Sequence, residues 1–233
     1  MRAIFLIGTN FVRTQWVVVA IMLAYLAGIA GVFGWHARRS EVVFFLHLHS
    51  LYAVFMGTMV AVPALQNERK SRRNLAVLSK GIHRRQYVAG LLCGCVMVAA
   101  LFCAVLGGAA LWLARRVEIA PAGLAGLLLA LLAAASASAS VALFFSTFLH
   151  PVLALGAAST LALLPFPLEA RGLYPPGALF PTASIMDMAI HFRFQPLGLG
   201  AWWLVAAAMA QALAFWLAAS AIFARQDVTT ASE

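Results

Sequence analysis

Two histidines are the only ionisable side chains that fall well inside an apolar stretch of this 233-residue sequence. They are His47 and His49, in the segment FFLHLHS. Because they are two positions apart, they would point about 200° apart around a helix and cannot hold one metal ion together. An ionisable group inside a membrane segment often marks a substrate path, so we consider that role beside a purely structural one. Ser50 and Thr58 follow in the same stretch and are candidates for the same path.

The sequence lacks the motifs of the common hydrolases. It contains no G-x-x-x-x-G-K-[ST], so the chain cannot bind ATP through a P-loop, and it contains no G-x-S-x-G or H-E-x-x-H. None of its seven Asp and Glu residues sits deep inside an apolar stretch, whereas proton-coupled transporters usually need carboxylates there. We therefore expect a chain with no enzymatic activity, metal or cofactor of its own.

The composition indicates that the elements carrying these residues lie in a bilayer. Apolar residues make up 64% of the chain and charged residues 10%, while soluble domains are nearer half apolar. The mean hydropathy is +0.95. Backbone groups cannot stay unpaired in lipid, and no alternating barrel pattern occurs, so the membrane segments should be helices. We expect an all-α integral membrane protein with a single membrane domain over residues 1–233.

Six apolar segments are long enough to cross a membrane, which takes roughly 20 helical residues. The predicted spans are residues 16–34, 42–64, 88–113, 122–148, 151–167 and 199–223, and the fifth is close to the lower limit. Six spans would place both termini on the same side of the membrane. Residues 1–15 form either a helix that lies in the inner interface or an extension of the first span.

Basic residues predict that both termini are cytoplasmic. In that orientation ten of the 16 Lys and Arg residues fall on the cytoplasmic side and six on the outer side. Seven of the ten lie in one stretch, QNERKSRRNLAVLSKGIHRRQY, over residues 66–87. The formal net charge of +9 is therefore explained by membrane orientation, and we expect no binding to nucleic acid.

Small residues in the fourth span predict a tight helix contact. The run AAASASASVA covers residues 133–142, and small side chains let helix backbones approach closely in lipid. The contact could lie within one subunit or between subunits.

Prolines break the region between the fifth and sixth spans, where we expect an extracytoplasmic cap of short helices over residues 168–198. Within it, TASIMDMAIHF predicts one short helix with Thr182 as its N-cap.

The loop between the second and third spans, residues 65–87, has a helical pattern of its own. Leu75, Leu78 and Ile82 recur at spacings of three and four, which places them on one helical face among the cations. Gly81 is a suitable helix end, and a second helix would begin at Arg84 and run into the third span. This pattern predicts an amphipathic cytoplasmic helix held between two spans. The alternative is a loop that only anchors to anionic lipids.

This order of parts resembles the permease subunit of the ABC-type-two exporters. That family has an interfacial N-terminal helix, six spans, a cytoplasmic coupling helix after the second span, and broken outer helices before the sixth. The local matches to the family's loop are Glu68-Arg69, the apolar Leu75, Val77 and Leu78, the later Arg84, and Gly90. The sequence departs from the family at Arg73-Asn74, where Gly-Thr is usual, at Ala76, which replaces an acid, and at Leu91, which replaces a lysine.

The resemblance implies an ATP-driven exporter in the bacterial cytoplasmic membrane. Two such subunits, as two copies or as a copy and a paralogue, would form the membrane core, with a separate ABC ATPase chain beneath each. ATP and magnesium would bind to the ATPase, and membrane lipids would surround the core. The residues expected to couple this chain to the ATPase are Glu68, Arg69, Arg72, Arg73, Leu75, Leu78, Ile82 and Arg84.

Two other functions fit the same topology. One is a six-span membrane subunit that binds substrate in a pocket inside one monomer. The other is a membrane scaffold or assembly factor whose loop docks a partner that is not an ATPase. The sequence does not identify a substrate for any of the three.

Overall fold

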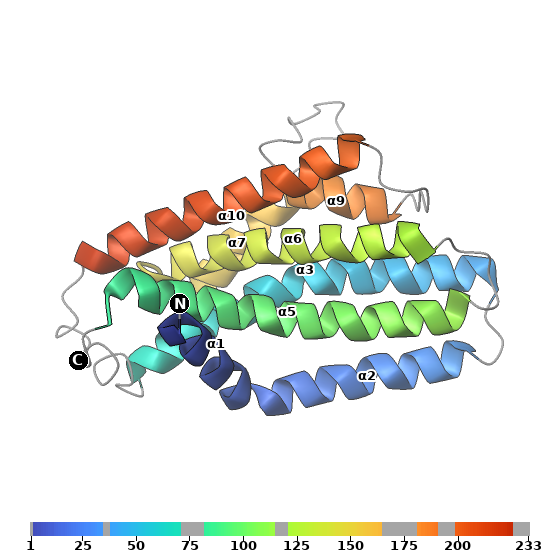
Figure 1. The fold of residues 1–233 in the computed structure, drawn as a ribbon, viewed down its shortest axis with the longest axis horizontal. Helices are drawn as coiled ribbons and strands as arrows, with labels where there is room; N and C mark the ends of the chain where they lie inside the picture. The colour runs from blue at the N-terminus through green and yellow to red at the C-terminus, as the bar shows by residue number, and fades with distance from the viewer. Residues whose placement is uncertain are drawn as a thin grey trace.

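The computed structural model describes residues 2–34, 38–70, 82–114, 121–164, 181–190 and 199–225, and every element in these ranges is an α-helix. Most of the helices run along the long axis of one bundle (Figure 1). In chain order they are α1 (Arg2–Thr14), α2 (Trp16–Gly34), α3 (Arg39–Lys70), α5 (Arg84–Ala114), α6 (Pro121–Ser146), α7 (Pro151–Leu163), α9 (Pro181–Ile190) and α10 (Leu199–Arg225).

Four helices in the described ranges are long and apolar enough to cross a membrane, namely α3, α5, α6 and α10. The α1–α2 pair passes the same test as one span bent by 65°. Helix α7 has 13 residues and is only about 20 Å long, short of the roughly 30 Å hydrocarbon core. The all-helical membrane fold is thus confirmed, while six full spans remain a prediction.

The ends of several helices differ from the sequence-based boundaries. Helix α3 continues to Lys70, six residues beyond the predicted end of the second span, so the helix projects past its apolar part. Helix α5 begins at Arg84, as predicted. Helix α9 begins at Pro181, so the assignment of Thr182 as an N-cap is wrong. Proline fits the first helical position because the missing N–H would have no helical partner there.

The closest helix contact in the bundle joins α3 to α6. Gly57 faces the backbone of α6 so closely that a Cβ at this position would collide with the carbonyl oxygen of Ala135 and lie 3.2 Å from the amide nitrogen of Ala139. Every residue from 133 to 142 is buried. The small-residue run of the fourth span therefore makes its tight contact within one subunit, the first of the two predicted possibilities.

The serines of this run satisfy their hydroxyl groups inside their own helix. Ser136 donates to the carbonyl of Leu132 at 2.7 Å, and Ser138 donates to that of Ala134 at 3.0 Å. Because the hydroxyls need no partner from another helix, they do not hold neighbouring backbones apart. This leaves the surface of α6 smooth enough for close packing.

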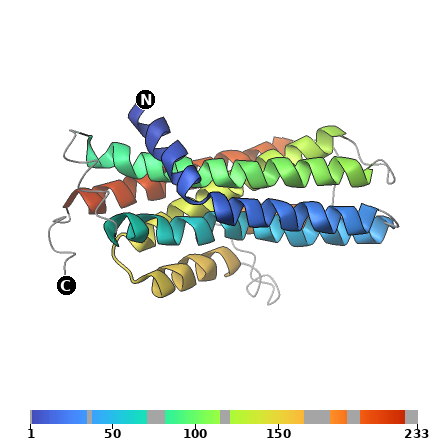
Figure 2. The same ribbon diagram turned by 90° about the horizontal axis from the view of Figure 1, so that it is seen from below.

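Glycine also permits the contact between α1 and α5. Gly90 and Gly94 form a G-x-x-x-G pair on α5, a spacing that lets a second helix approach closely in lipid. A Cβ at Gly90 would lie 2.7 Å from the Cβ of Ile7, and one at Gly94 would lie 2.7 Å from Cδ1 of Phe11. Helix α1 consequently crosses α5 at a steep angle and lies directly on it (Figure 2).

We predict that Gly57→Ala destabilises the protein. One added methyl group must push α3 away from the backbone of α6, and overpacking of this kind costs about 1–3 kcal/mol. The matched control is Gly108→Ala on α5, where a Cβ meets nothing within 4 Å. Thermal unfolding of the purified protein in detergent should shift downward for Gly57→Ala alone. Equal unfolding temperatures for the two variants would contradict the close contact.

Candidate functional site

The predicted coupling segment is only partly covered by the described residues. Residues 71–81, which contain Arg72, Arg73, Leu75 and Leu78, lie outside them. Glu68 and Arg69 belong to the last turns of α3, and Arg84 is the first residue of α5. The ends of α3 and α5 that flank the segment lie at the same end of the bundle as the last turn of α10 (Figure 1).

Ile82 lies in a two-residue link, outside any helix, directly before α5. It therefore does not extend a helical face that begins at Leu75 and Leu78. Its side chain is half-buried, whereas the next residue, His83, is exposed. Ile82 thus lies at the junction between the coupling segment and the bundle. The docking role predicted from the sequence therefore applies to Leu75 and Leu78 before Ile82.

Arg84 fastens the start of α5 to the end of α10. Its Nη1 donates to the carbonyl oxygen of Ala224 at 2.9 Å and lies 3.4 Å from that of Phe223. The last carbonyls of a helix have no partner inside the helix, and the negative end of the helix dipole attracts a cation. The guanidinium group of Arg84 therefore acts as a cap for α10, supplied by a residue 140 positions away.

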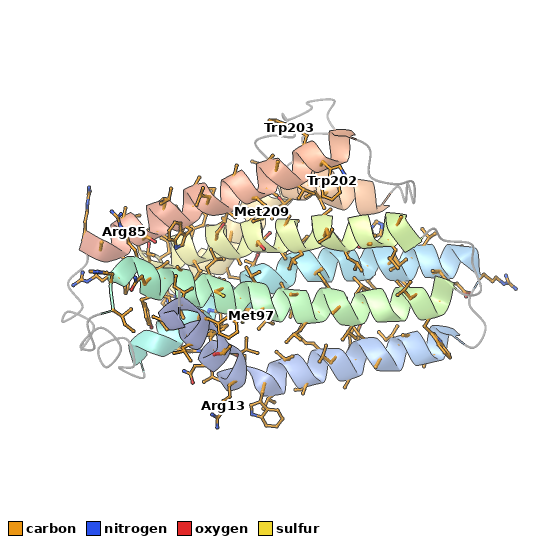
Figure 3. The ribbon with its side chains drawn as sticks, in the orientation of Figure 1. Arg13, Arg85, Met97, Trp202, Trp203 and Met209 are labelled. Atoms are coloured by element: carbon orange, nitrogen blue, oxygen red, sulfur yellow. The ribbon has the colours of Figure 1, made fainter. Side chains whose placement is uncertain are left out.

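An aromatic pair strengthens the same junction. Tyr87, one turn after Arg84, stacks on Phe223 with ring centroids 5.9 Å apart and ring planes 19° apart. Both rings are buried. Arg85, by contrast, is exposed at this end of the bundle, and Trp202 and Trp203 mark the opposite end of α10 (Figure 3). The first turn of α5 and the last turn of α10 therefore form one packed unit beside the predicted coupling segment.

The residues proposed for a substrate path lie in the first two thirds of α3. His47 is half-buried, while Ser50 and Thr58 are buried at 2% and 1% exposure. The Ser50 hydroxyl donates to the carbonyl of Leu46 at 2.6 Å. Buried positions of this kind fit core packing, and a role in transport remains a prediction for all three.

Only one of the two ring nitrogens of His49 has a hydrogen-bond partner among the described residues. Its Nδ1 donates to the carbonyl oxygen of Phe45 at 2.7 Å, and the Phe45 ring lies 4.2 Å away between centroids. Its Nε2 has no hydrogen-bond partner among the described residues. Aromatic rings of Tyr25 and Tyr52 also surround the imidazole, at 5.9 and 5.7 Å. The ring is thus enclosed by α2 and α3 and fixed by its own helix.

Two features escaped the sequence analysis. The contact partner of Gly90 and Gly94 is α1, although the G-x-x-x-G spacing itself is visible in the sequence. Gln211 is a polar residue in the middle of the alanine-rich α10, and it attracts no attention because it carries no charge. Its Oε1 is buried and has no hydrogen-bond partner among the described residues.

The fold and its apolar helices define this chain as an all-helical, multi-pass membrane protein. A comparison with protein-family models and with curated proteins finds no match for it. Any more specific function must therefore be argued from the chain's own residues and their geometry.

We predict that Arg84→Ala loosens the end of α10. Hydrogen bonds from a charged donor contribute about 1.5–3 kcal/mol, and partial solvent exposure places the expected loss near the lower end of that range. Hydrogen–deuterium exchange over the last two turns of α10 should rise, and Arg84→Lys should recover part of the protection. The control is Arg85→Ala, which removes an exposed neighbouring cation. Unchanged exchange in Arg84→Ala would show that the cap does not hold α10.

Proposed function

We propose that this chain is the membrane permease subunit of an ATP-driven ABC transporter of the type-two exporter class. A separate ATPase chain would bind ATP and magnesium, and a second permease copy or paralogue would complete the membrane core. Both termini would be cytoplasmic, in the cytoplasmic membrane of a bacterium. The observation that carries the proposal is the basic segment 71–81 between two long, continuous helices, next to the Arg84 junction.

Helix length supports a segment held out in water. Helices α3 and α5 have 32 and 31 residues, which correspond to about 48 and 46 Å, against roughly 30 Å for the hydrocarbon core. Both helices must therefore extend beyond the apolar layer, and their basic ends are at residues 69–70 and 84–85. A segment carried on two projecting helices is well placed to meet a soluble partner. A loop that only anchored to lipid headgroups would not need this extension.

The contacts inside the bundle suggest how force would travel. In the proposed mechanism, ATP closes the ATPase dimer and displaces the segment that holds Leu75 and Leu78. Movement of the segment would pull on α3 and α5 together, since both flank it. Helix α6 would follow α3 through the Gly57 contact, and α10 would follow α5 through the Arg84 cap. The bundle would then move as a unit, and a path between two subunits would open outward.

The substrate-binding alternative receives less support from the described residues. It requires a formed pocket inside one subunit. The cavity where α6, α7, α9 and α10 meet measures about 10 Å³. The larger hollow, of about 410 Å³, is a wide-open and mostly apolar depression between α1 and α5, lined by Thr9, Val12, Met97, Ala100 and Leu101, so neither is an enclosed substrate pocket. A transport path between two subunits needs no large pocket within either of them.

We predict that Leu75→Asp combined with Leu78→Asp abolishes binding of the ATPase chain. The two leucines that we propose to enter an apolar groove of the ATPase would be replaced by charges, which cannot enter such a groove without a partner. Co-purification from membranes and permease-stimulated ATPase activity in vesicles should both be lost, with membrane insertion unchanged. The matched control is Ala76→Asp, which adds a charge between the two leucines, at the position where the resembling family carries an acid.

Two outcomes would overturn the proposal. One is wild-type ATPase stimulation by the double variant. The other is the absence of any ATPase chain after chemical cross-linking through a reactive group placed at Ser79 in the same segment. A crosslinked partner without a P-loop would instead favour the scaffold function.

A further inference from the structure

Gln211 lines a small, partly open cavity and carries a buried acceptor without a partner among the described residues. The cavity lies where α6, α7, α9 and α10 meet, and it measures about 10 Å³. Its polar lining consists of Ser138 from α6, Thr182 from α9 and Gln211 from α10. Apolar side chains, among them Val141 and Leu161, complete the wall. The Oε1 atom of Gln211 is buried without a hydrogen-bond partner among the described residues.

The three polar groups do not complete one another's hydrogen bonds. The Ser138 hydroxyl already donates its proton to the carbonyl oxygen of Ala134 at 3.0 Å, so towards the cavity it can only accept. Gln211 Oε1 is also an acceptor. Two acceptors cannot bond to each other, and an unsatisfied buried acceptor destabilises the fold. The Thr182 hydroxyl has one proton to donate, so both acceptors are satisfied together only if a further donor is present.

A water molecule fits this requirement in both size and chemistry. A cavity of roughly 10–15 Å³ holds one water, provided that the water finds two to four polar partners. A water here would donate to Gln211 Oε1 and to Ser138 Oγ. It would still have a lone pair to accept the proton of the Thr182 hydroxyl. Each of the three polar side chains then has a partner.

We propose that this cavity is a binding site for a single buried water that ties α9 to α6 and α10. Helix α9 is a ten-residue helix, and Thr182, Ala183 and Ile185 are buried against the bundle. Ile185 supplies the apolar contact. The water adds hydrogen bonds, which are directional, whereas an apolar contact is not. The water fixes where α9 sits between α6 and α10. This role is independent of what the protein transports.

Two variants remove the partners of the water one at a time. Thr182→Val keeps the shape of the side chain and deletes its hydroxyl, while Gln211→Leu deletes the acceptor. In each variant we expect amide hydrogen exchange in α9 to rise about two- to thirteenfold, which corresponds to the loss of one hydrogen bond contributing about 0.5–1.5 kcal/mol. The two effects together should be smaller than their sum, because both variants lose the same water.

Two further variants serve as controls. Thr182→Ser keeps the hydroxyl and should retain the exchange rates of the natural chain. Ser140→Ala deletes a buried hydroxyl on the same helix as Ser138, one that donates to Ala137 within α6 at 2.7 Å, and should leave α9 unchanged. If Gln211→Leu fails to fold, the Thr182→Val and Thr182→Ser pair decides the matter alone.

A cryo-electron-microscopy map of the protein in nanodiscs provides the direct test. Density for one water between Ser138, Thr182 and Gln211 in the natural chain, and its loss in Thr182→Val or Gln211→Leu, would support the proposal. An empty cavity in a map that resolves other buried waters would overturn it. So would additive effects of the two variants on the exchange of α9.

Discussion

The close backbone contact between α3 and α6 is the constraint on which the rest of the bundle depends. Lipid tails are as apolar as leucine side chains, so helices in a membrane gain little from hydrophobic burial and associate through packing instead. Gly57 and the small residues around Ala135 bring two backbones together. The other helices then pack on the pair: α5 contacts both α3 and α6, and α10 and α7 cover α6. The serines of α6 can be tolerated in this core because each bonds within its own helix.

Burial decreases from this centre towards the edges of the bundle. In an apolar 18-residue stretch of α6, 78% of the residues are buried, whereas in the corresponding stretch of α10 only 22% are. Helix α10 packs along α6 and also contacts α5 and α9, but much of its surface is exposed because it lies at the edge of the bundle. At one end Arg84 caps its last carbonyls, and Phe223 stacks on Tyr87. Farther along the helix, Gln211 lines the cavity shared with α6, α7 and α9.

Sequence patterns located most of the helices because membrane spans can be recognised by their length and hydropathy alone. They were less accurate at the ends. Residues 66–70 are polar and therefore resemble a loop, yet they continue α3, since a helix does not stop where the apolar layer stops. Thr182 resembles an N-cap, but Pro181 already occupies the first helical position. The Arg84 cap could not be predicted, because no sequence pattern links it to carbonyls about 140 residues away. The role proposed for Gln211 could not be predicted either, because Ser138 and Thr182, which line the same cavity, come from other helices.

The positions of the two junctions of α10 bear on how the bundle could respond to a partner. A force applied to the segment between α3 and α5 reaches Arg84 within three residues of the last residue of that segment, because α5 begins there. The hydrogen bonds of Arg84 reach the last carbonyls of α10, so in the proposed mechanism they would carry a displacement of α5 to α10. At the level of the cavity, the proposed water joins Ser138 of α6, Thr182 of α9 and Gln211 of α10. A cap at one end and a water-mediated link farther along the helix would make α10 follow both α5 and α6 when the bundle moves.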